Sequence, residues 1–273
     1  MTRTRRDVHD KPVHRIYDSE GREVGYEQMR DGIASADVLL FGEIHGNPVA
    51  HRLEFEITKD LCRILHGKIT LGAEMFEADT QLVIDEYLAG LITSDHFRRD
   101  ARAWDNYVRD YQPLVEFARE HGLTFVATNI PRRYASLVVR EGLGALRRLP
   151  REAARFVAPP PVEADVSQPD YGEVAAMSAA HGRDPELFVV AQAVKDATMA
   201  HFISTRRVPG SLFIHYHGVL HSRDFGGIYW YLKGISPLLA VVTVTCAESE
   251  TSDFSDDHRG SGDYVVVIPG SMT

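Results

Sequence analysis

Cysteine is scarce in this chain of 273 residues, where only Cys62 and Cys246 are present. Two cysteines cannot build the dense disulfide framework of a small secreted domain. Cys62 falls in an apolar helical pattern and Cys246 near the end of an apolar strand. We therefore expect both to be buried free thiols, with a single disulfide between them as the alternative.

Long apolar runs are also missing, and no run approaches the roughly 18 residues of a transmembrane helix. We therefore expect no transmembrane segment. The first residues, MTRTRRDVHDKP, are polar, and no apolar stretch follows their basic side chains. They do not resemble an intact secretory signal, and they contain no lipobox. We expect residues 1–12 to be a disordered tail, residues 13–273 to be a single domain, and the location to be cytoplasmic if the chain is complete.

An excess of positive charge is lacking too, because the formal net charge is −9. Nucleic-acid binding domains usually carry a basic face or stripe. No such stretch is evident along this chain, so we expect no nucleic-acid partner.

Short apolar segments alternate with amphipathic helical segments along most of the chain. Strands are expected at 37–41, 69–73, 123–128, 211–216 and 238–246, with an edge strand at 264–268 and a β-hairpin within 14–25. Helices are expected at 26–34, 48–65, 78–89, 105–121, 131–140, 184–205 and 227–233. This alternation indicates βαβ units. The expected fold class is α/β: a mostly parallel central sheet flanked by helices, with a smaller helical lobe and a helical insertion at about 142–185.

Polar side chains follow several of the expected strands directly. In open parallel sheets, ligands bind beyond the carboxyl ends of the strands. Those ends are followed here by Phe41-Gly-Glu-Ile-His-Gly-Asn47, by Glu74-Met-Phe-Glu77, by Asn129-Ile-Pro-Arg-Arg133 and by His217-Gly-Val-Leu-His221. Carboxylates, imidazoles, an amide and guanidinium groups should therefore converge at one edge of the sheet.

Glu43 and His45 are the strongest candidates for function. Their spacing of two places both side chains on the same side of an extended loop. A Glu beside a His holds one imidazole tautomer and raises its basicity, which suits a general base or a metal ligand. Glu74 ends an apolar strand, where a partly desolvated carboxylate needs a cation or a His as partner. A structural salt bridge or a helix cap is the alternative for Glu74.

His217 and His221 are further candidates at the end of the fourth expected strand. Residues four apart share a face only if the segment is helical. A divalent metal could be held by Glu43, His45, Glu74, His217 and His221. Gln192 and Asp196 lie one turn apart on an apolar helix, where polar side chains need partners, so they could buttress the site.

A third group of candidates could bind a cofactor. Asn129 and Arg132 follow a strand end, and Arg132 could bind a carboxylate or propionate through both guanidinium nitrogens. Trp104, Tyr107 and Tyr111 form an aromatic set at helical spacing. These rings could pack in the core, or they could form the wall of a pocket for a flat ligand.

Several motifs, taken together and in order, resemble the ChaN-like family. They are Phe-Gly-Glu-Ile-His-Gly-Asn from Phe41, Ala-Glu-Met-Phe-Glu from Ala73, Tyr-Gln-Pro-Leu-Val-Glu-Phe-Ala from Tyr111, Asn-Ile-Pro-Arg from Asn129, Gln-x-x-x-Asp-Ala-Thr-Met-Ala from Gln192 and His-Gly-x-x-His from His217. ChaN-like proteins form the haem-binding uptake branch of a superfamily that also contains Tiki-type proteases and erythromycin esterases. The resemblance covers about residues 37–233.

The resemblance implies haem binding, iron uptake and a homodimer that holds haem between its protomers. It also implies an envelope lipoprotein, although this chain shows no lipobox. In the wider superfamily the related motif carries hydrolysis, and Glu43, His45, Glu74 and His221 occupy the positions of its active site. His217 departs from the expected pattern, in which Gly or Asn often stands. The resemblance does not identify the haem-ligating tyrosine.

Three functions remain open from the sequence. A haem-binding protein needs an axial ligand, for which Tyr107, Tyr111, Tyr134, Tyr171, Met177 and Tyr231 are candidates. A hydrolase, acting on a peptide, an ester or a lactone, could use a metal-activated water, or His45 as base with Glu74 as second carboxyl group. A non-catalytic binding or assembly module could keep the same polar cluster for stability alone.

Overall fold

The computed structural model describes residues 14–165, 167–182 and 184–270. The disordered tail expected at residues 1–12 lies outside these ranges. The strands are β1 (Arg15–Asp18), β2 (Glu23–Val24), β3 (Val38–Glu43), β4 (Ile69–Glu77), β5 (Phe125–Asn129), β6 (Leu212–Gly218), β7 (Val241–Ser249) and β8 (Tyr264–Pro269). They form one sheet in the order β2-β1-β8-β7-β3-β6-β4-β5, in which all neighbours from β8 to β5 run parallel. The expected α/β fold with a mostly parallel central sheet is confirmed.

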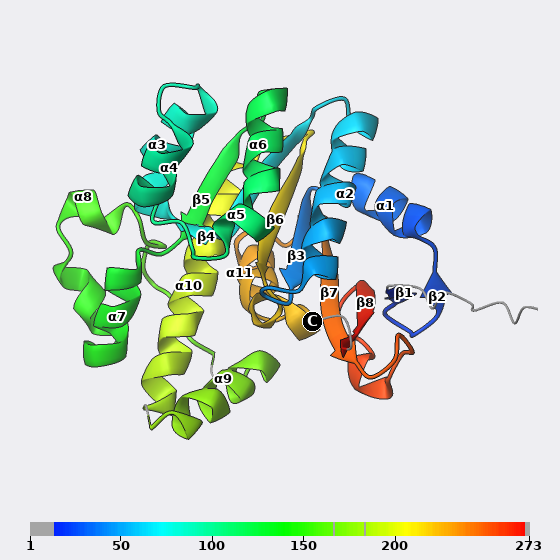
Figure 1. Ribbon diagram of the computed structural model, residues 1–273. Coiled ribbons are helices and arrows are strands. Elements are labelled where there is room, and N and C mark those ends of the chain that lie inside the picture. The colour runs from blue at the N-terminus through cyan, green and yellow to red at the C-terminus, as the bar shows by residue number, and fades with distance from the viewer. Residues whose placement is uncertain (1–13, 166, 183, 271–273) are drawn as a thin grey trace, which may run out of the picture.

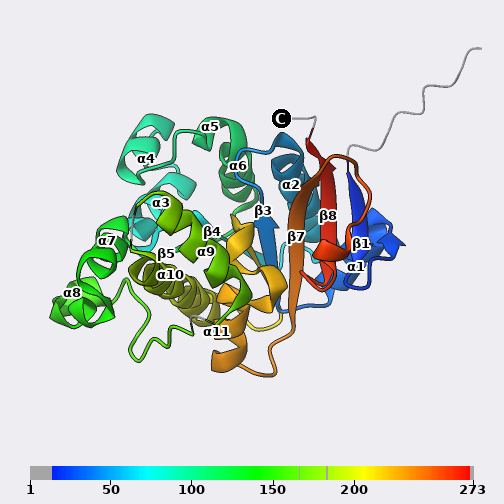
Figure 2. The ribbon, with the colours of Figure 1, turned by 90° about the horizontal axis from the view of Figure 1, so that it is seen from below.

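Helices cover both faces of this sheet. The α-helices are α1 (Tyr26–Ala34), α2 (Pro48–Ile64), α3 (Gln81–Leu88), α4 (Ser94–Asp100), α5 (Tyr107–Asp110), α6 (Gln112–His121), α7 (Arg132–Glu141), α8 (Arg151–Ala154), α9 (Pro169–Ala180), α10 (Pro185–Arg206) and α11 (Gly227–Ile235). Short 3-10 helices are η1 (Ala78–Thr80), η2 (Leu143–Arg148), η3 (Val219–His221), η4 (Arg223–Phe225) and η5 (Asp256–His258). Figures 1 and 2 show α2 and α6 on one face and α10 and α11 on the other. Within the described residues, no helix combines the length and apolar character that crossing a bilayer requires.

The alternation of side chains along β3 divides the core into two layers. Leu39 and Phe41 pack with residues of α1, α2 and α6, whereas Val38 and Leu40 pack with residues of α10 and α11. Successive side chains of a strand point to opposite faces. Every residue of β3 is buried. A strand covered on both faces needs apolar side chains on both of them, which explains why its sequence is nearly continuously apolar.

The ends of the two long helices follow the local chemistry of their sequences. The side chain of Asn47 accepts hydrogen bonds from the amides of Val49 and Ala50 at the start of α2. Asp184 accepts from two amides at the start of α10 in the same way. A side-chain acceptor followed by Pro at the first helical position is a strong start signal. Both starts agree with the sequence-based expectation.

The strand at 264–268 was expected at the edge of the sheet, and the structure corrects this position. β8 pairs with β7 on one side and with β1 on the other, so it lies inside the sheet. The hairpin of β1 and β2 folds back antiparallel onto β8 and supplies the outer strands on that side. A contact between residues so far apart in the chain leaves no local signal.

The single helix expected at 105–121 is also corrected, because the structure has two helices there. Its α5 and α6 parts are separated at Tyr111, which serves as the end of α5 and the start of α6. Pro113 lies in the first turn of α6 and has no amide hydrogen to continue the preceding helix. The break turns the side chain of Tyr111 towards the sheet, where its hydroxyl reaches Glu43.

The opposite edge strand, β5, is covered by a side chain. Gln81 at the start of α3 donates a hydrogen bond to the carbonyl of Phe125 and accepts one from the amide of Ala127, at 2.9 and 2.8 Å. Its amide group thereby takes the place that a neighbouring strand's peptide group would take. Both cysteines are buried and free, as expected.

Candidate functional site

The carboxyl ends of β3, β4 and β6 bring the leading candidates to one rim of the sheet. Glu43 is the last residue of β3 and pairs in register with Gly218, the last residue of β6. Glu74 lies in the second half of β4, His45 lies just beyond the end of β3, and His221 is the last residue of η3, which follows β6. The convergence expected from the strand ends is therefore present, although the side chains divide between the two faces of the sheet.

The first group of side chains, which we call the α2-side cluster, comprises Glu43, His45, His51, Glu54, Asp110 and Tyr111. His45 Nδ1 and the Tyr111 hydroxyl each donate to Glu43 Oε1, both at 2.6 Å. Glu43 is 1% exposed. Burial would raise the pKa of Glu43, but the hydrogen bond from His45 and the close approach of the His51 ring outweigh it and hold that pKa well below its usual range. Glu43 is therefore ionised, and its charge fixes the proton of His45 on Nδ1.

His51 and Glu54, on α2, complete this cluster and were missed by sequence reasoning. His51 Nδ1 lies 3.1 Å from Glu54 Oε2 and 3.3 Å from Glu43 Oε2. Burial lowers the pKa of His51, but the carboxyl groups of Glu43 and Glu54 raise it to about 10. Burial and the charge of Glu43 raise the pKa of Glu54 well above its usual value. The available signal was their position, because both lie on the face of α2 that carries Leu53, Ile57 and Leu61.

The second group, the α10-side cluster, comprises Glu74, Asp196 and His221, with Gln192 and Tyr171 beside them. His221 Nε2 donates to Glu74 Oε1 at 3.0 Å, and His221 Nδ1 donates to Asp196 Oδ1. Burial lowers the pKa of His221, but Glu74 and Asp196 raise it to about 10. His221 is thus a buried cation between two carboxyl groups, and burial raises the pKa of Asp196.

The outer members of this cluster hold Asp196 and His221 in place. Tyr171 donates to Asp196 Oδ2 at 2.9 Å, and the side-chain amide of Gln192 lies 3.0 Å from His221 Nδ1. Gln192 and Asp196 therefore touch the site residue His221, as a buttressing role requires.

The two clusters meet at His45 and Gly218. The amide of Gly218 donates to Glu74 Oε2 at 2.9 Å. A Cβ atom at Gly218 would lie 2.6 Å from His45 Nε2, so the absence of a side chain there leaves room for that ring. The His45 side chain is 46% exposed. Its Nε2, free of Glu43, therefore stands at the junction of both clusters and within reach of the surface.

His217 belongs to neither cluster. Thr128 donates its hydroxyl hydrogen to the carbonyl of Ala73 and so accepts from His215 Nε2 at 2.7 Å. His215 Nδ1 then accepts from His217 Nδ1 at 3.0 Å, and His217 Nε2 accepts from Ser222 at 2.8 Å. Burial and the cationic His221 lower the pKa of His217 to about 3, so this chain of bonds is neutral.

The structure does not bring together the five residues expected to form a metal site. Glu43 lies on the α2 face, Glu74 and His221 lie on the α10 face, and both nitrogens of His217 are engaged elsewhere. Within the described residues, a different set presents one ligand atom each within 4.8 Å of one another: Glu43, His51 and Glu54. This set shares Glu43 with the five residues expected from the sequence, whereas its other two members lie on α2.

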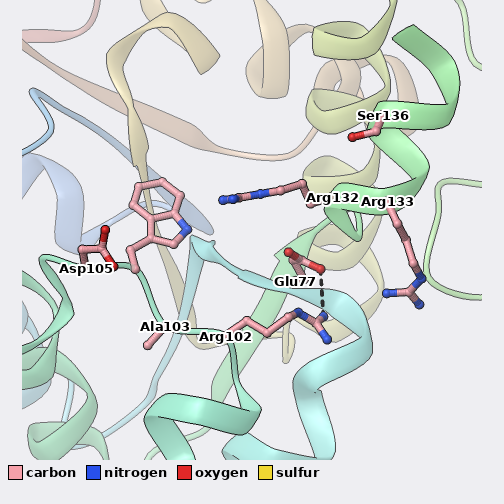
Figure 3. A pocket seen from close by; sticks show the side chains of 8 residues that line it. Glu77, Arg102, Ala103, Asp105, Arg132, Arg133 and Ser136 are labelled. Carbon is pink, nitrogen blue, oxygen red and sulfur yellow. Dashed lines mark hydrogen bonds and ion pairs between the residues drawn. The ribbon is translucent and has the colours of Figure 1, made fainter. Parts of the chain in front are cut away.

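A cavity of about 620 Å³ opens beside the junction. Its lining includes Glu77, Arg102, Trp104, Arg132, Arg133 and Ser136. In Figure 3 the side chain of Arg132 reaches across this cavity, whereas Arg102 is bonded to Glu77 and Arg133 turns away. Trp104 joins the cavity to the site, because its ring meets the edge of His45 at 5.3 Å between centroids. The cavity thus offers a cation and an indole next to His45.

The other residues expected to bind a cofactor have different roles here. Tyr107 and Tyr111 are buried, so of the two roles considered for the aromatic set they take core packing, and Trp104 alone lines the cavity. The side chain of Asn129 donates to the carbonyl of Glu74 at 3.0 Å and so holds the end of β4. Arg132 keeps its expected place as a cation facing open space.

Comparisons with known proteins agree on the family. A family model described as "Haem-binding uptake, Tiki superfamily, ChaN" matches residues 29–232. ChaN of Campylobacter jejuni, whose structure is described as showing cofacial haem binding, superposes with a TM-score of 0.72 at 18% identity, covering 94% of this chain and 97% of that one. This likeness establishes a shared fold.

Two further comparisons give a lower TM-score or cover less of the chain. An erythromycin esterase mutant gives a TM-score of 0.49 at 11% identity, covering 85% of this chain and 77% of that one, which is too low to support an argument. Protein RETICULATA-RELATED 5, chloroplastic, of Arabidopsis thaliana is 25% identical over 150 residues, which are 50% of this chain and only 20% of that protein. Because the family model spans most of the chain and the motifs lie within its range, the chain belongs to the ChaN family of haem-binding uptake proteins in the Tiki superfamily.

Proposed function

We propose that this protein binds haem at the rim of the sheet, with His45 Nε2 as axial ligand. The observation that carries the proposal is the 2.6 Å hydrogen bond from His45 Nδ1 to the buried Glu43 carboxylate. A metal-ligating histidine almost always donates its other ring N–H in this way, which fixes the tautomer and makes the free nitrogen a better ligand. Iron in haem would take the free Nε2.

The residues around His45 fit part of what haem needs. Arg132 faces open space, where it can pair with a propionate, and Trp104 offers an aromatic wall. The broad apolar slot is not complete in one chain, because Trp104 and Ala103 are the apolar residues among those that line the cavity. A second copy that brings the same rim face to face would cover the exposed side of the haem. The description of cofacial haem binding in the Campylobacter protein supports such a homodimer.

Four of the five tyrosines considered as axial ligands are less suitable. Tyr107, Tyr111, Tyr171 and Tyr231 are at most 8% exposed. Tyr111 and Tyr171 also donate their hydroxyl hydrogens to Glu43 and Asp196. Haem iron needs a donor atom that it can approach, and His45 meets this condition better than these four hydroxyl groups.

A hemin titration tests this proposal. We expect a shifted Soret band that saturates at about one hemin per chain and is lost in His45→Ala. The matched control is His96→Ala, which changes an exposed histidine on α4. Gel filtration with and without hemin would report the dimer. A wild-type titration without a shifted band, or an unchanged band in His45→Ala, would contradict the proposal.

Iron uptake and an envelope location are part of the same proposal, supported by family membership. Fractionation of cells that express the chain from its native gene tests the location. Growth with haem as the sole iron source, compared between the intact and the deleted gene, tests the uptake. Loss of growth restored by the wild-type gene but not by His45→Ala is the expected result.

A second candidate function, hydrolysis, is favoured by a specific observation. Haem ligation through His45 makes no use of the buried Glu74–His221–Asp196 relay, which borders His45 through Gly218. In a hydrolase, His45 Nε2 would accept a proton from water while Glu43 holds its Nδ1 hydrogen. Burial lowers the pKa of His45, but the hydrogen bond with Glu43 and the charges of Glu74 and Glu43 together outweigh it and raise that pKa, which makes the ring a stronger base. The carboxylate of Glu74 would stabilise the positive charge that His45 acquires with the proton.

A panel of ester, lactone and peptide substrates separates this function from haem binding. The hydrolase predicts turnover that falls at least about a hundredfold in both His45→Ala and Glu74→Gln. Haem binding predicts that Glu74→Gln leaves the Soret band in place. The combination of no turnover on the panel and normal hemin binding would remove the second candidate.

A further inference from the structure

The α2-side cluster contains a buried set of ligand atoms behind the Glu43–His45 pair. His51 Nδ1 lies 3.3 Å from Glu43 Oε2 and 3.1 Å from Glu54 Oε2. One ligand atom from each of the three side chains lies within 4.8 Å of the others. Atoms bound to one ion at about 2.1 Å lie about 3.0–3.4 Å apart in octahedral or tetrahedral geometry. The two measured separations fall within that range.

Two oxygens of this set lack hydrogen-bond partners within the described part of the chain. They are Glu43 Oε2 and Glu54 Oε1, and both side chains are 0% exposed. His51 approaches Glu43 Oε2 closely, but the contact does not have hydrogen-bond geometry. Burying a carboxylate without full compensation is costly, and a bound cation removes that cost. The unpaired oxygens therefore leave two acceptor positions that a cation could occupy.

Polar groups also surround the far side of the His51 ring. His51 Nε2 lies 3.2 Å from the amide nitrogen of Gly46, which donates to it, and 3.6 Å from the buried Asp110 Oδ2. The Tyr111 hydroxyl bonds to Glu43 Oε1, so Oε1 is held while Oε2 faces His51. Carboxylates behind histidine ligands and hydrogen bonds to carboxylate ligands are the usual outer contacts of protein metal sites.

We propose that Glu43 Oε2, His51 Nδ1 and Glu54 bind one divalent ion of the Mn²⁺ or Zn²⁺ class. One imidazole and two carboxylates suit these ions better than the all-oxygen preference of Ca²⁺. The ion replaces the protons that His51 and Glu54 carry without it, so binding releases protons to the solvent. The site is distinct from the proposed haem site, although both contact Glu43: the ion uses Oε2 of this carboxylate and His45 uses Oε1.

Calorimetric titration of untagged protein tests the proposal, after treatment with a chelator and dialysis. MnCl₂ and ZnCl₂ are the probes. We expect about one ion per chain and an affinity that falls at least about tenfold in both His51→Gln and Glu54→Gln. The matched control is Glu74→Gln, which removes a buried carboxylate of the α10-side cluster. The control should keep the wild-type affinity.

Three results would overturn the proposal: no binding to the wild type, full binding in both variants of α2, or a loss confined to Glu74→Gln. Circular dichroism checks that each variant is folded. If a variant unfolds, anomalous diffraction from a Mn²⁺-soaked wild-type crystal decides instead. An ion bonded to Glu43, His51 and Glu54 supports the site, and an ion elsewhere contradicts it. Hemin binding can fail without changing these outcomes, so the two proposals are tested separately.

Discussion

The two clusters at the rim contain the same kinds of side chain but differ in how these are bonded. Each holds an imidazole between two carboxyl groups: His51 between Glu43 and Glu54, and His221 between Glu74 and Asp196. In the α10-side cluster both ring nitrogens donate to carboxyl oxygens. In the α2-side cluster a single nitrogen faces both carboxyl groups, and two carboxyl oxygens stay unpaired. The first arrangement is complete as a protein structure, whereas the second leaves room for a cation.

The comparison also shows how His45 differs from the other two histidines. His45 is the one imidazole of the two clusters that reaches the surface, since His51 and His221 are 6% and 5% exposed. Its Nδ1 bonds to one cluster and its Nε2 stands over Gly218, which bonds to the other. Both buried clusters therefore help to position one accessible ring, that of His45.

Breaking the complete cluster should have the largest effect. Asp196→Ala leaves the buried His221 cation with Glu74 alone, and removing one partner of a buried ion pair costs about 3 kcal/mol or more. We expect the free energy of unfolding, measured in urea, to fall by about 3 kcal/mol. The control Asp253→Ala removes an exposed partner of Arg15 and should change stability by less than about 1 kcal/mol. Equal losses in both variants would contradict this account of the cluster.

The pH dependence of stability should show the proton held by His221. Its pKa is about 10 in the folded chain against about 6.5 when unfolded. The folded state binds this proton more tightly, so the stabilisation is full below pH 6.5 and is lost as the pH rises towards 10. We expect the unfolding free energy to decline by on the order of 2 kcal/mol over that window.

The variant His221→Gln should flatten this decline in a series of urea titrations across pH. The exposed-site variant His96→Gln serves as control and should keep it. His51, whose pKa is also about 10, should contribute a decline of its own that remains in His221→Gln. A slope that is identical in the wild type and His221→Gln would show that His221 carries no extra proton.

Removing a tyrosine hydroxyl group should lower the free energy of unfolding where that hydroxyl is hydrogen-bonded, and should not lower it where the hydroxyl has no partner. Tyr111→Phe deletes the hydrogen bond to the charged Glu43 and should lower the unfolding free energy by about 1.5 kcal/mol. Tyr107→Phe is the matched control, because the Tyr107 hydroxyl is buried and has no partner among the described residues. Its removal should leave stability unchanged or raise it. Thermal unfolding of both variants checks the contrast, which a larger loss in Tyr107→Phe would refute.

The smallest effect on stability is expected where the clusters meet. Gly218→Ala places a Cβ atom 2.6 Å from His45 Nε2, and the half-exposed ring can move away at a cost of less than about 1 kcal/mol. The displaced ring should nevertheless weaken hemin binding about tenfold, measured by Soret titration. Gly144→Ala, where a Cβ atom meets nothing within 4 Å, is the control and should bind normally. Unchanged hemin affinity in Gly218→Ala would separate His45 from haem binding.

The sequence predicted those features that depend on neighbouring residues. The caps of α2 and α10 and the alternation of strands and helices are local signals, and they agree with the structure. Glu43, His45, Glu74 and His221 could be placed at one rim because parallel strands send their carboxyl ends to the same edge. The alternation of side chains along each strand could also be predicted. The face of the sheet to which Glu43 or Glu74 points, however, follows only from the strand order.

The remaining features depend on contacts between distant segments. His51 and Glu54 look like ordinary polar residues of an amphipathic helix until α2 is packed against the end of β3. The position of β8 inside the sheet requires its pairing with β1 from the other end of the chain. His217 was chosen for its type and position, but Ser222 and His215 take up both of its nitrogens.

The Gln81 side chain on β5 has a consequence for assembly. By bonding to Phe125 and Ala127 it occupies the backbone groups through which a further strand would join the sheet. On the opposite side, the outermost strand β2 has only two residues. Growth of the sheet from chain to chain is therefore blocked on one side and poorly templated on the other. The homodimer proposed above would therefore form through side chains and not through a shared sheet.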